Sequence, residues 1–155
     1  MEQLTLEAVI DKAIQREEEA FAFYEDLTGR VEDAVSRDTL HFMAREELKH
    51  KTILQQYKSG ELGKEALPLR TIVDARVVEA LGVPELAGPM HHKDIFLFAA
   101  QREKASQEFY QRLAELQPQG ALQGLLRTFA EEEQRHKEKA EYLYCNAAFP
   151  QTDGG

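Results

Sequence analysis

Two short stretches of the sequence decide the fold: Glu47-Leu48-Lys49-His50 and Glu133-Gln134-Arg135-His136. Each stretch places a carboxylate three residues before an imidazole, within a long helix-forming run. Side chains spaced i,i+3 lie on one face of an α-helix, so the two groups of each stretch can act together. Each stretch therefore has the form of one half of a metal site shared between helices.

The stretches belong to a longer internal repeat with an offset of 86 residues, in which residues 13–57 align without a gap on residues 99–143. With five His in the chain, a single Glu-x-x-His pair can arise by chance on a solvated helix face. A duplicated set, each with a Glu thirty residues upstream and a Tyr seven residues after that Glu, is much harder to explain in this way. The candidate site residues form four twin pairs: Glu17 and Glu103, Glu47 and Glu133, His50 and His136, Tyr24 and Tyr110.

Apolar residues recurring every three or four positions predict helices over about residues 5–29, 34–58, 93–116 and 121–147. Thr5 is a predicted N-cap and Gly29 a predicted C′ glycine of the first helix. The Glu and His candidates fall on the apolar stripes. The neighbouring Glu46 and Glu132 are turned away by roughly 100°, which predicts positions on the outer face and no role as ligands.

Residues 60–91 break the helical pattern with repeated Gly and Pro, and predict a long crossover with one short helix over about residues 71–81. The crossover is apolar enough that part of it should pack on the helices. No segment alternates with period two, so no sheet is expected. His91 and His92 are adjacent, and adjacent helical positions diverge by roughly 100°, which favours a surface position over a metal site.

Short connections make consecutive helices antiparallel neighbours, and the long crossover separates two helix pairs. The fold class predicted is therefore all-α, an up-down-down-up four-helix bundle in which the repeat creates a pseudo-two-fold axis. We expect residues 1–149 to form one domain and residues 150–155 a flexible tail.

Composition narrows the functional classes. The chain of 155 residues is 43% hydrophobic, typical of one globular domain, and its net charge of −9 is distributed along helices without a basic patch, so nucleic acid is not an expected partner. Cys145 is the only cysteine, which excludes an intramolecular disulfide and a rubredoxin-type iron site and fits a cytoplasmic location. Without a signal sequence or an apolar run of roughly 18 residues, neither export nor a membrane is expected.

Charge predicts the kind of metal site. Four carboxylates buried at one level of a bundle would repel one another and lose solvation unless something neutralised them. Two divalent cations balance the four Glu with both imidazoles neutral, so two ions are favoured over one. Mixed carboxylate and imidazole ligands suit iron, manganese or a mixed pair better than zinc or calcium.

At these residues the sequence resembles the rubrerythrin branch of the ferritin-like di-iron carboxylate superfamily, over both helix pairs. The resemblance implies a ferritin-like bundle with two iron ions. It also implies roles for the residues: Glu47 and Glu133 bridge the ions, Glu17 and Glu103 each bind one ion, His50 and His136 cap one ion each, and Tyr24 and Tyr110 act in catalysis through hydrogen bonds to ligand carboxylates.

Two departures shape the expected function. Rubrerythrins carry a rubredoxin domain that relays electrons, so here we expect an external donor, a rubredoxin-like protein or a flavoprotein. Rubrerythrins also have an extra Glu one turn after the third-helix ligand, where this chain has Ser106.

The first interpretation is an oxidoreductase that reduces hydrogen peroxide or dioxygen with ferrous iron, and we expect a homodimer. The alternatives are a ferroxidase that stores or transfers iron, and metals that only stabilise the bundle.

Overall fold

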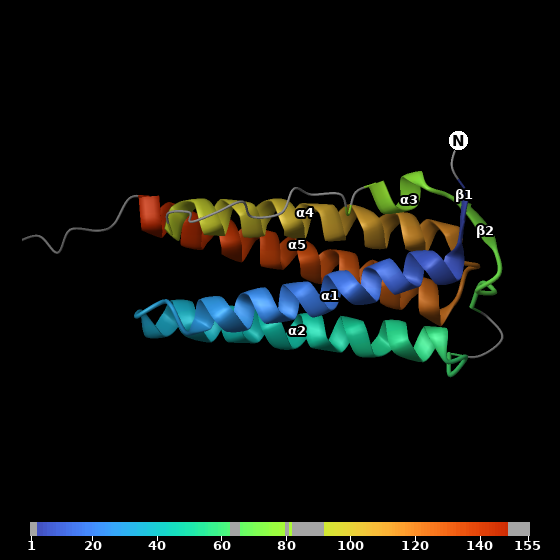
Figure 1. Cartoon of the computed structure of the whole chain (residues 1–155), viewed down its shortest axis with the longest axis horizontal. Helices are drawn as coiled ribbons and strands as arrows, with labels where there is room; N and C mark the ends of the chain where they lie inside the picture. Colours follow the sequence, from blue (N-terminus) through green and yellow to red (C-terminus); the bar gives the residue numbers. More distant parts are fainter. Residues whose placement is uncertain (1–2, 63–65, 80, 82–91, 149–155) are drawn as a thin grey trace, which may run out of the picture.

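The computed structural model describes residues 3–62, 66–79, 81 and 92–148. Its four long helices are α1 (Leu6–Thr28), α2 (Ala34–Lys58), α4 (His92–Leu116) and α5 (Ala121–Ala148). Figure 1 shows α1 beside α2 and α4 beside α5, with the chain running up-down-down-up through the two pairs. The predicted all-α four-helix bundle is therefore confirmed.

Each long helix begins and ends within one residue of its predicted bounds. The Thr5 side chain accepts a hydrogen bond of 3.2 Å from the Ala8 amide, as expected of an N-cap. Gly29 ends α1 with φ −76°, so the prediction of a left-handed C′ glycine there is wrong. Gly60 has φ 82°, a left-handed conformation that favours glycine at the turn after α2.

The crossover is tied to the bundle rather than free, as its apolar composition predicts. Leu62, Leu67 and Leu69 pack against one of the two apolar core clusters of the bundle. The crossover carbonyls of Leu69 and Thr71 accept hydrogen bonds of 2.9 and 2.7 Å from the first amides of α1. Amides in the first turn of a helix have no acceptor within that helix, and the two crossover carbonyls supply one for each of these amides.

The prediction that no sheet forms is wrong. Strands β1 (Gln3–Thr5) and β2 (Ile72–Asp74) pair antiparallel, with Leu4 opposite Val73. Strands of three residues are too short to show the period-two alternation on which sequence reading depends. The predicted helix over residues 71–81 is reduced to α3 (Arg76–Glu79), because the pairing takes the first residues of that span.

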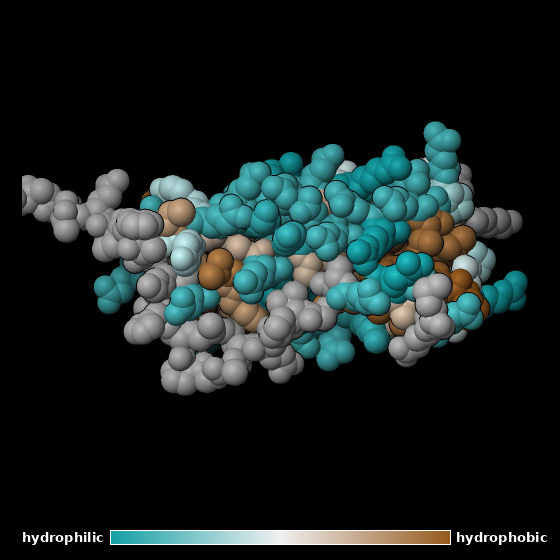
Figure 2. Space-filling model, turned by 90° about the horizontal axis from the view of Figure 1, so that it is seen from above, coloured by the Kyte–Doolittle hydropathy of each residue, from teal (hydrophilic) through white to brown (hydrophobic). Residues whose placement is uncertain are grey.

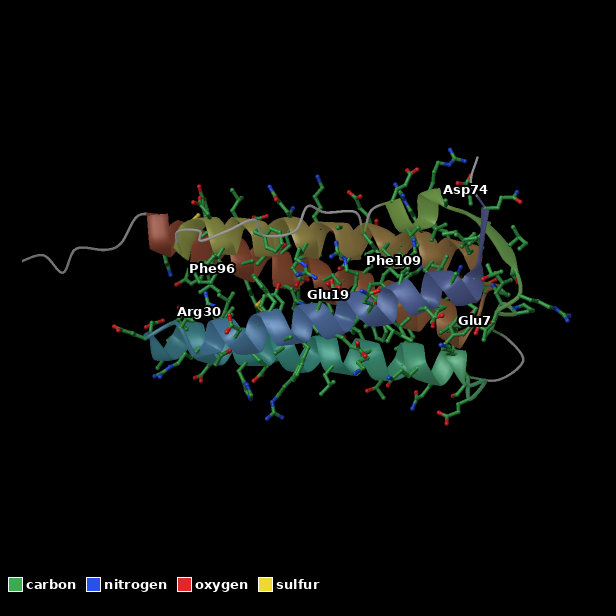
Figure 3. All side chains as sticks on the ribbon, viewed as in Figure 1. Glu7, Glu19, Arg30, Asp74, Phe96 and Phe109 are labelled. Carbon is green, nitrogen blue, oxygen red and sulfur yellow. The ribbon has the colours of Figure 1, made fainter. Side chains whose placement is uncertain are left out.

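The core consists of two apolar clusters separated by a polar band. One cluster contains Leu6, Ile10 and Phe109, and the other contains Leu27 and Phe96. Figure 3 shows Phe109 and Phe96 toward opposite ends of α4. Because these clusters fill both ends of the bundle, the Glu and His stripes come together at its middle.

The surface is mostly polar. Figure 2 shows hydrophilic residues over much of one face of the bundle, with apolar residues gathered at the end that carries β1 and β2. Among the described residues, no helix is both long and apolar enough to cross a membrane. His91 and residues 150–155 lie outside the described part of the chain, and so does the side chain of His92.

Candidate metal centre

All six predicted ligands meet between the two apolar clusters, and every long helix contributes at least one. Glu17 lies on α1 and Glu103 on α4, while α2 and α5 each supply a Glu-x-x-His pair. None of the six is more than 2% exposed. The helical spacing read from the sequence therefore places each of these side chains in the interior. The six are Glu17, Glu47, His50, Glu103, Glu133 and His136.

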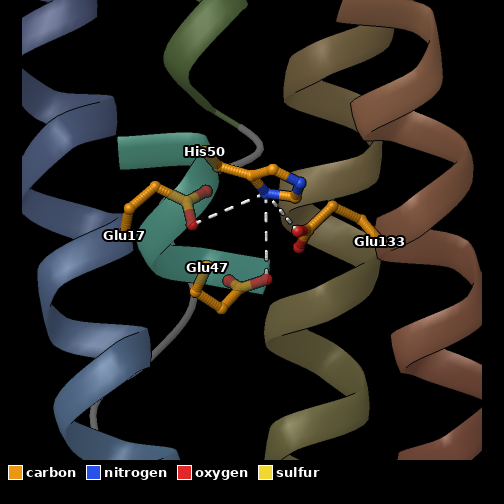
Figure 4. A group of neighbouring side chains, drawn as sticks. All are labelled: Glu17, Glu47, His50 and Glu133. Carbon is orange, nitrogen blue, oxygen red and sulfur yellow. Dashed lines mark ion pairs between the residues drawn. The ribbon is translucent and has the colours of Figure 1, made fainter. Parts of the chain in front are cut away.

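The first ligand set surrounds His50 (Figure 4). Its Nδ1 atom lies 2.9 Å from Glu133 Oε1, 3.8 Å from Glu17 Oε2 and 3.9 Å from Glu47 Oε1. Two atoms that bind the same ion at about 2.1 Å can be separated by no more than about 4.2 Å. These three distances therefore fit ligands that converge on one ion.

The second set surrounds His136 in the same way. Its Nδ1 atom lies 3.0 Å from Glu47 Oε1, 3.4 Å from Glu103 Oε2 and 3.7 Å from Glu133 Oε1. Within each set, ligand atoms of all four residues lie within 4.8 Å of one another. Glu47 and Glu133 belong to both sets, as expected of two residues shared between neighbouring ions.

Unsatisfied polar atoms test whether a metal fits this geometry. Within the described residues, eight buried side-chain atoms lack a hydrogen bond of acceptable geometry, and all eight belong to the six predicted ligands. They include both His Nδ1 atoms and both carboxylate oxygens of Glu133. Folded proteins rarely leave buried polar atoms unpaired, since each costs free energy. Metal ions between the two sets would satisfy these atoms, so the residues present fit a metal centre.

The two tyrosines cross from one half of the repeat to the other. Tyr110 donates a hydrogen bond of 2.7 Å to Glu17 Oε1, and Tyr24 donates to Glu103 Oε1. Burial and the nearby carboxylates raise the pKa of both phenols well above the ordinary value, so both remain neutral donors. The tyrosines therefore hold Glu17 and Glu103, while a catalytic role for them stays a prediction.

Without metal, two of the four carboxylates bind protons more tightly than an exposed Glu does. Burial, followed by the charge of neighbouring carboxylates, raises the pKa of Glu17 and of Glu133 well above the ordinary value. Burial also acts to raise the pKa of Glu47, but the interaction with the neighbouring His136 outweighs it and lowers that pKa to about 2. Against its own burial, the carboxylates of Glu103 and Glu47 raise the pKa of His136 to about 10. In the metal-free protein, protons on Glu17, Glu133 and His136 therefore provide the positive charge that metal ions would bring.

Sequence reasoning missed the part played by Glu132. We predicted an outward position, but Glu132 is 6% exposed and accepts a hydrogen bond of 2.6 Å from His50 Nε2. The bond to His50 also lowers the pKa of Glu132, which is therefore a carboxylate at neutral pH. A carboxylate on the outer nitrogen of a metal-binding His fixes the ring and its tautomer. The available signal was the repeat itself, which preserves Glu46 and Glu132 as twins.

Glu46 is placed less closely than its twin. Its Oε1 atom lies 3.7 Å from His136 Nε2, which is beyond hydrogen-bond distance, and the residue is partly exposed. The prediction of an outer position therefore describes Glu46 better than Glu132.

Comparisons with known proteins agree with this geometry. The rubrerythrin family model matches residues 8–144. A crystal structure from Thermotoga maritima, described as a candidate ferritin-like diiron-carboxylate protein, superimposes with a TM-score of 0.73 at 18% sequence identity, covering 93% of this chain and 97% of that one. At this identity the likeness supports the fold alone. Comparison with curated proteins gave no match.

Proposed function

Since the chain belongs to the rubrerythrin family, we propose that its buried Glu and His cluster holds two iron ions and that the protein is an oxidoreductase acting on hydrogen peroxide or dioxygen. When bound, a ferrous pair would supply the two electrons that reduce one hydrogen peroxide, with two protons, to two water molecules. An external donor, a rubredoxin-like protein or a flavoprotein, returns the electrons.

The observation that carries this proposal is that the two predicted ligand sets share Glu47 and Glu133. It is supported by the buried side-chain atoms without a hydrogen bond, which among the described residues all belong to the six predicted ligands. A single ion would need only one set. Four carboxylates balance the charge of two ferrous ions, so the reduced centre is neutral in an apolar bundle. This charge balance favours binding of two ferrous ions over binding of one.

The protein residues around the centre then have distinct tasks. Glu47 and Glu133 hold both ions together. Tyr24 and Tyr110 keep the Glu103 and Glu17 carboxylates oriented through hydrogen bonds across the pseudo-two-fold axis. The two apolar clusters at the ends of the bundle exclude bulk water, which protects the reduced centre from side reactions.

A ferroxidase that stores or transfers iron is the second function that the site supports. The observation that favours it is Ser106, which lies near Glu103 and Glu47 where rubrerythrins have an additional Glu. In this alternative the oxidised iron is the product and leaves the centre, whereas in the first it stays and is reduced again.

Stopped-flow oxidation of anaerobically iron-loaded protein distinguishes these functions. We expect two ferrous ions per chain and consumption of one hydrogen peroxide per two ions oxidised. Iron retained through repeated cycles of oxidation and reduction supports the oxidoreductase, and iron released after one cycle supports the ferroxidase. Binding of one ion per chain, or no oxidation by either oxidant, contradicts the di-iron proposal.

A further inference from the structure

The metal centre has a small opening between α1 and α4. The residues that border it are Arg16, Ala20, Phe23 and Tyr24 of α1, Glu47 of α2, and Arg102, Glu103 and Ser106 of α4. Tyr24, Glu47 and Glu103 are buried and form its inner end. The opening lies at the pseudo-two-fold axis, because Arg16 and Arg102 are twins in the repeat, and so are Ala20 and Ser106. Two small side chains therefore face each other where larger ones would close the gap between the helices.

On the opposite side of the bundle, between α2 and α5, side chains fill the space beside the centre. There Glu132 binds His50, and Lys49 Nζ lies 3.4 Å from Glu132 Oε1. The Phe42 ring packs edge-on against the ring of His136, with centroids 6.4 Å apart. Both His residues are at most 1% exposed. Among the described residues, these contacts close the α2 and α5 side, whereas the opening beside Ser106 reaches Glu47 and Glu103.

Two guanidinium groups lie at the rim of the opening. Arg16 and Arg102 both contact Glu19, each with a guanidinium nitrogen 3.4 Å from Oε2, and Figure 3 shows Glu19 near the middle of the bundle. Arg102 also lies over the rings of Phe23 and Phe98, 5.8 and 5.7 Å from their centroids.

The size of the opening limits what can enter. The volume open to the centre of a water-sized molecule is ≈ 10 Å³, enough for about one water molecule. A space of this volume suits dioxygen, hydrogen peroxide and azide, whereas the organic group of a larger hydroperoxide does not fit in it.

We propose that the opening between α1 and α4 is the route by which small ligands reach the metal centre, that Ser106 keeps it open, and that Arg102 favours anions within it. The inference rests on the proposed function and narrows its substrates to dioxygen and hydrogen peroxide, excluding organic hydroperoxides.

Azide binding to the oxidised, iron-loaded protein tests the route without measuring activity. The Ser106→Leu variant fills the opening, and we expect azide to bind at least about tenfold more slowly, as followed by its charge-transfer absorption, with two irons per chain retained. The matched control is Gln107→Leu, because Gln107 lies one position along α4 and lines a separate groove between α4 and α5. Azide binding at the wild-type rate in Ser106→Leu, with both irons present, would overturn the route.

The charge of the rim is tested by Arg102→Gln. We expect azide to bind about three- to tenfold more weakly, with a smaller dependence on salt, while the uncharged ligand nitric oxide binds the reduced protein unchanged. Equal loss for both ligands would show that Arg102 acts through packing and would remove it from the proposal.

A second variant covers the case in which Ser106→Leu loses iron. This variant is metal-free Ser106→Cys, which also carries Cys145→Ser to remove the native thiol. The ratio of its modification rate by a small methyl thiosulfonate to its rate by a bulky maleimide should exceed the same ratio for a free thiol by at least about tenfold. Similar relative rates would contradict the size limit. If azide enters through the opening but the protein reduces neither peroxide nor dioxygen, the proposed function is refuted and the route stands. If the protein reduces peroxide or dioxygen at the same rate with and without Ser106→Leu, the route is refuted and the proposed function stands.

Discussion

Removing the metal should make the stability of the protein fall as the pH rises. In the metal-free chain, burial and neighbouring carboxylates raise the folded-state pKa of Glu17 and Glu133 above the unfolded value. A group with a raised folded-state pKa stabilises the fold fully below its unfolded pKa, about 4.3 for Glu, and this contribution is lost as the pH rises through the folded value. Metal-bound carboxylates stay ionised, so the loaded protein should lack this dependence.

The size of the effect follows from counting protons. Each carboxyl that keeps its proton in the folded state and loses it on unfolding changes the free energy of unfolding by about 1.4 kcal/mol per pH unit. Two such groups give a decrease of about 2.7 kcal/mol per pH unit above about pH 5, until the folded-state pKa values are reached. His136, whose folded-state pKa is about 10, adds to the decrease above its unfolded value of 6.5. Glu47 acts in the opposite direction only at acid pH, because its folded-state pKa is about 2.

Urea unfolding of metal-free protein at half-unit steps from pH 5 to pH 8 measures the slope. The control is the double variant Glu17→Gln and Glu133→Gln, in which the two titrating groups are gone and exposed groups still titrate. We expect a steep decline in the metal-free wild type and a much flatter curve in the variant. Equal free energies of unfolding at pH 5 and pH 8 in metal-free wild type would refute the buried, interacting carboxylates described here.

Further predictions concern the individual ligands and their supports. Glu47→Gln should reduce iron binding from two ions per chain to at most one, since an amide carries no charge and bridges metals poorly; two ions by metal analysis would remove Glu47 from the shared position. Glu132→Ala should weaken metal binding about 10- to 100-fold, because His50 loses the carboxylate on its outer nitrogen, whereas Glu46→Ala should change it little; equal losses in competition with a chelator would contradict the contrast between the twins. Tyr110→Phe should keep both ions but alter the ligand-field spectrum of the oxidised centre, because the Glu17 carboxylate loses its donor; an unchanged spectrum would show that the hydrogen bond is dispensable. The expected homodimer is checked by analytical ultracentrifugation of the loaded protein, and a monomer at micromolar concentration would contradict it.

Sequence periodicity was sufficient to predict the four long helices and the interior position of all six predicted ligands. A helix repeats its facing positions every three or four residues, so a Glu within an apolar stripe such as Glu17 can be assigned to the interior from spacing alone. The strands β1 and β2 could not be predicted, because their pairing depends on how the crossover returns to the start of α1. Three residues carry too little pattern to show such a contact.

Glu132 was missed for a different reason. The helical phase correctly separates Glu132 from the stripe of Glu133, but a side chain turned away from its own stripe can still reach a neighbouring helix. The position of Glu132 is decided by the packing of α5 against α2, which brings its carboxylate to His50 Nε2. Such contacts between helices depend on distances that the sequence of one helix does not contain.

The repeat produces a symmetric set of ligands in surroundings that are not symmetric. The set around His50 is supported from outside by Glu132, which binds the ring directly, whereas Glu46 stays 3.7 Å from the ring of His136. The opening beside Ser106 reaches Glu47 and Glu103, which both belong to the set around His136. One set is therefore held more firmly and the other faces the opening. Two ions bound by identical residues would therefore differ in ligand rigidity and in access, and a molecule entering by the proposed route would meet the ion nearer His136 first.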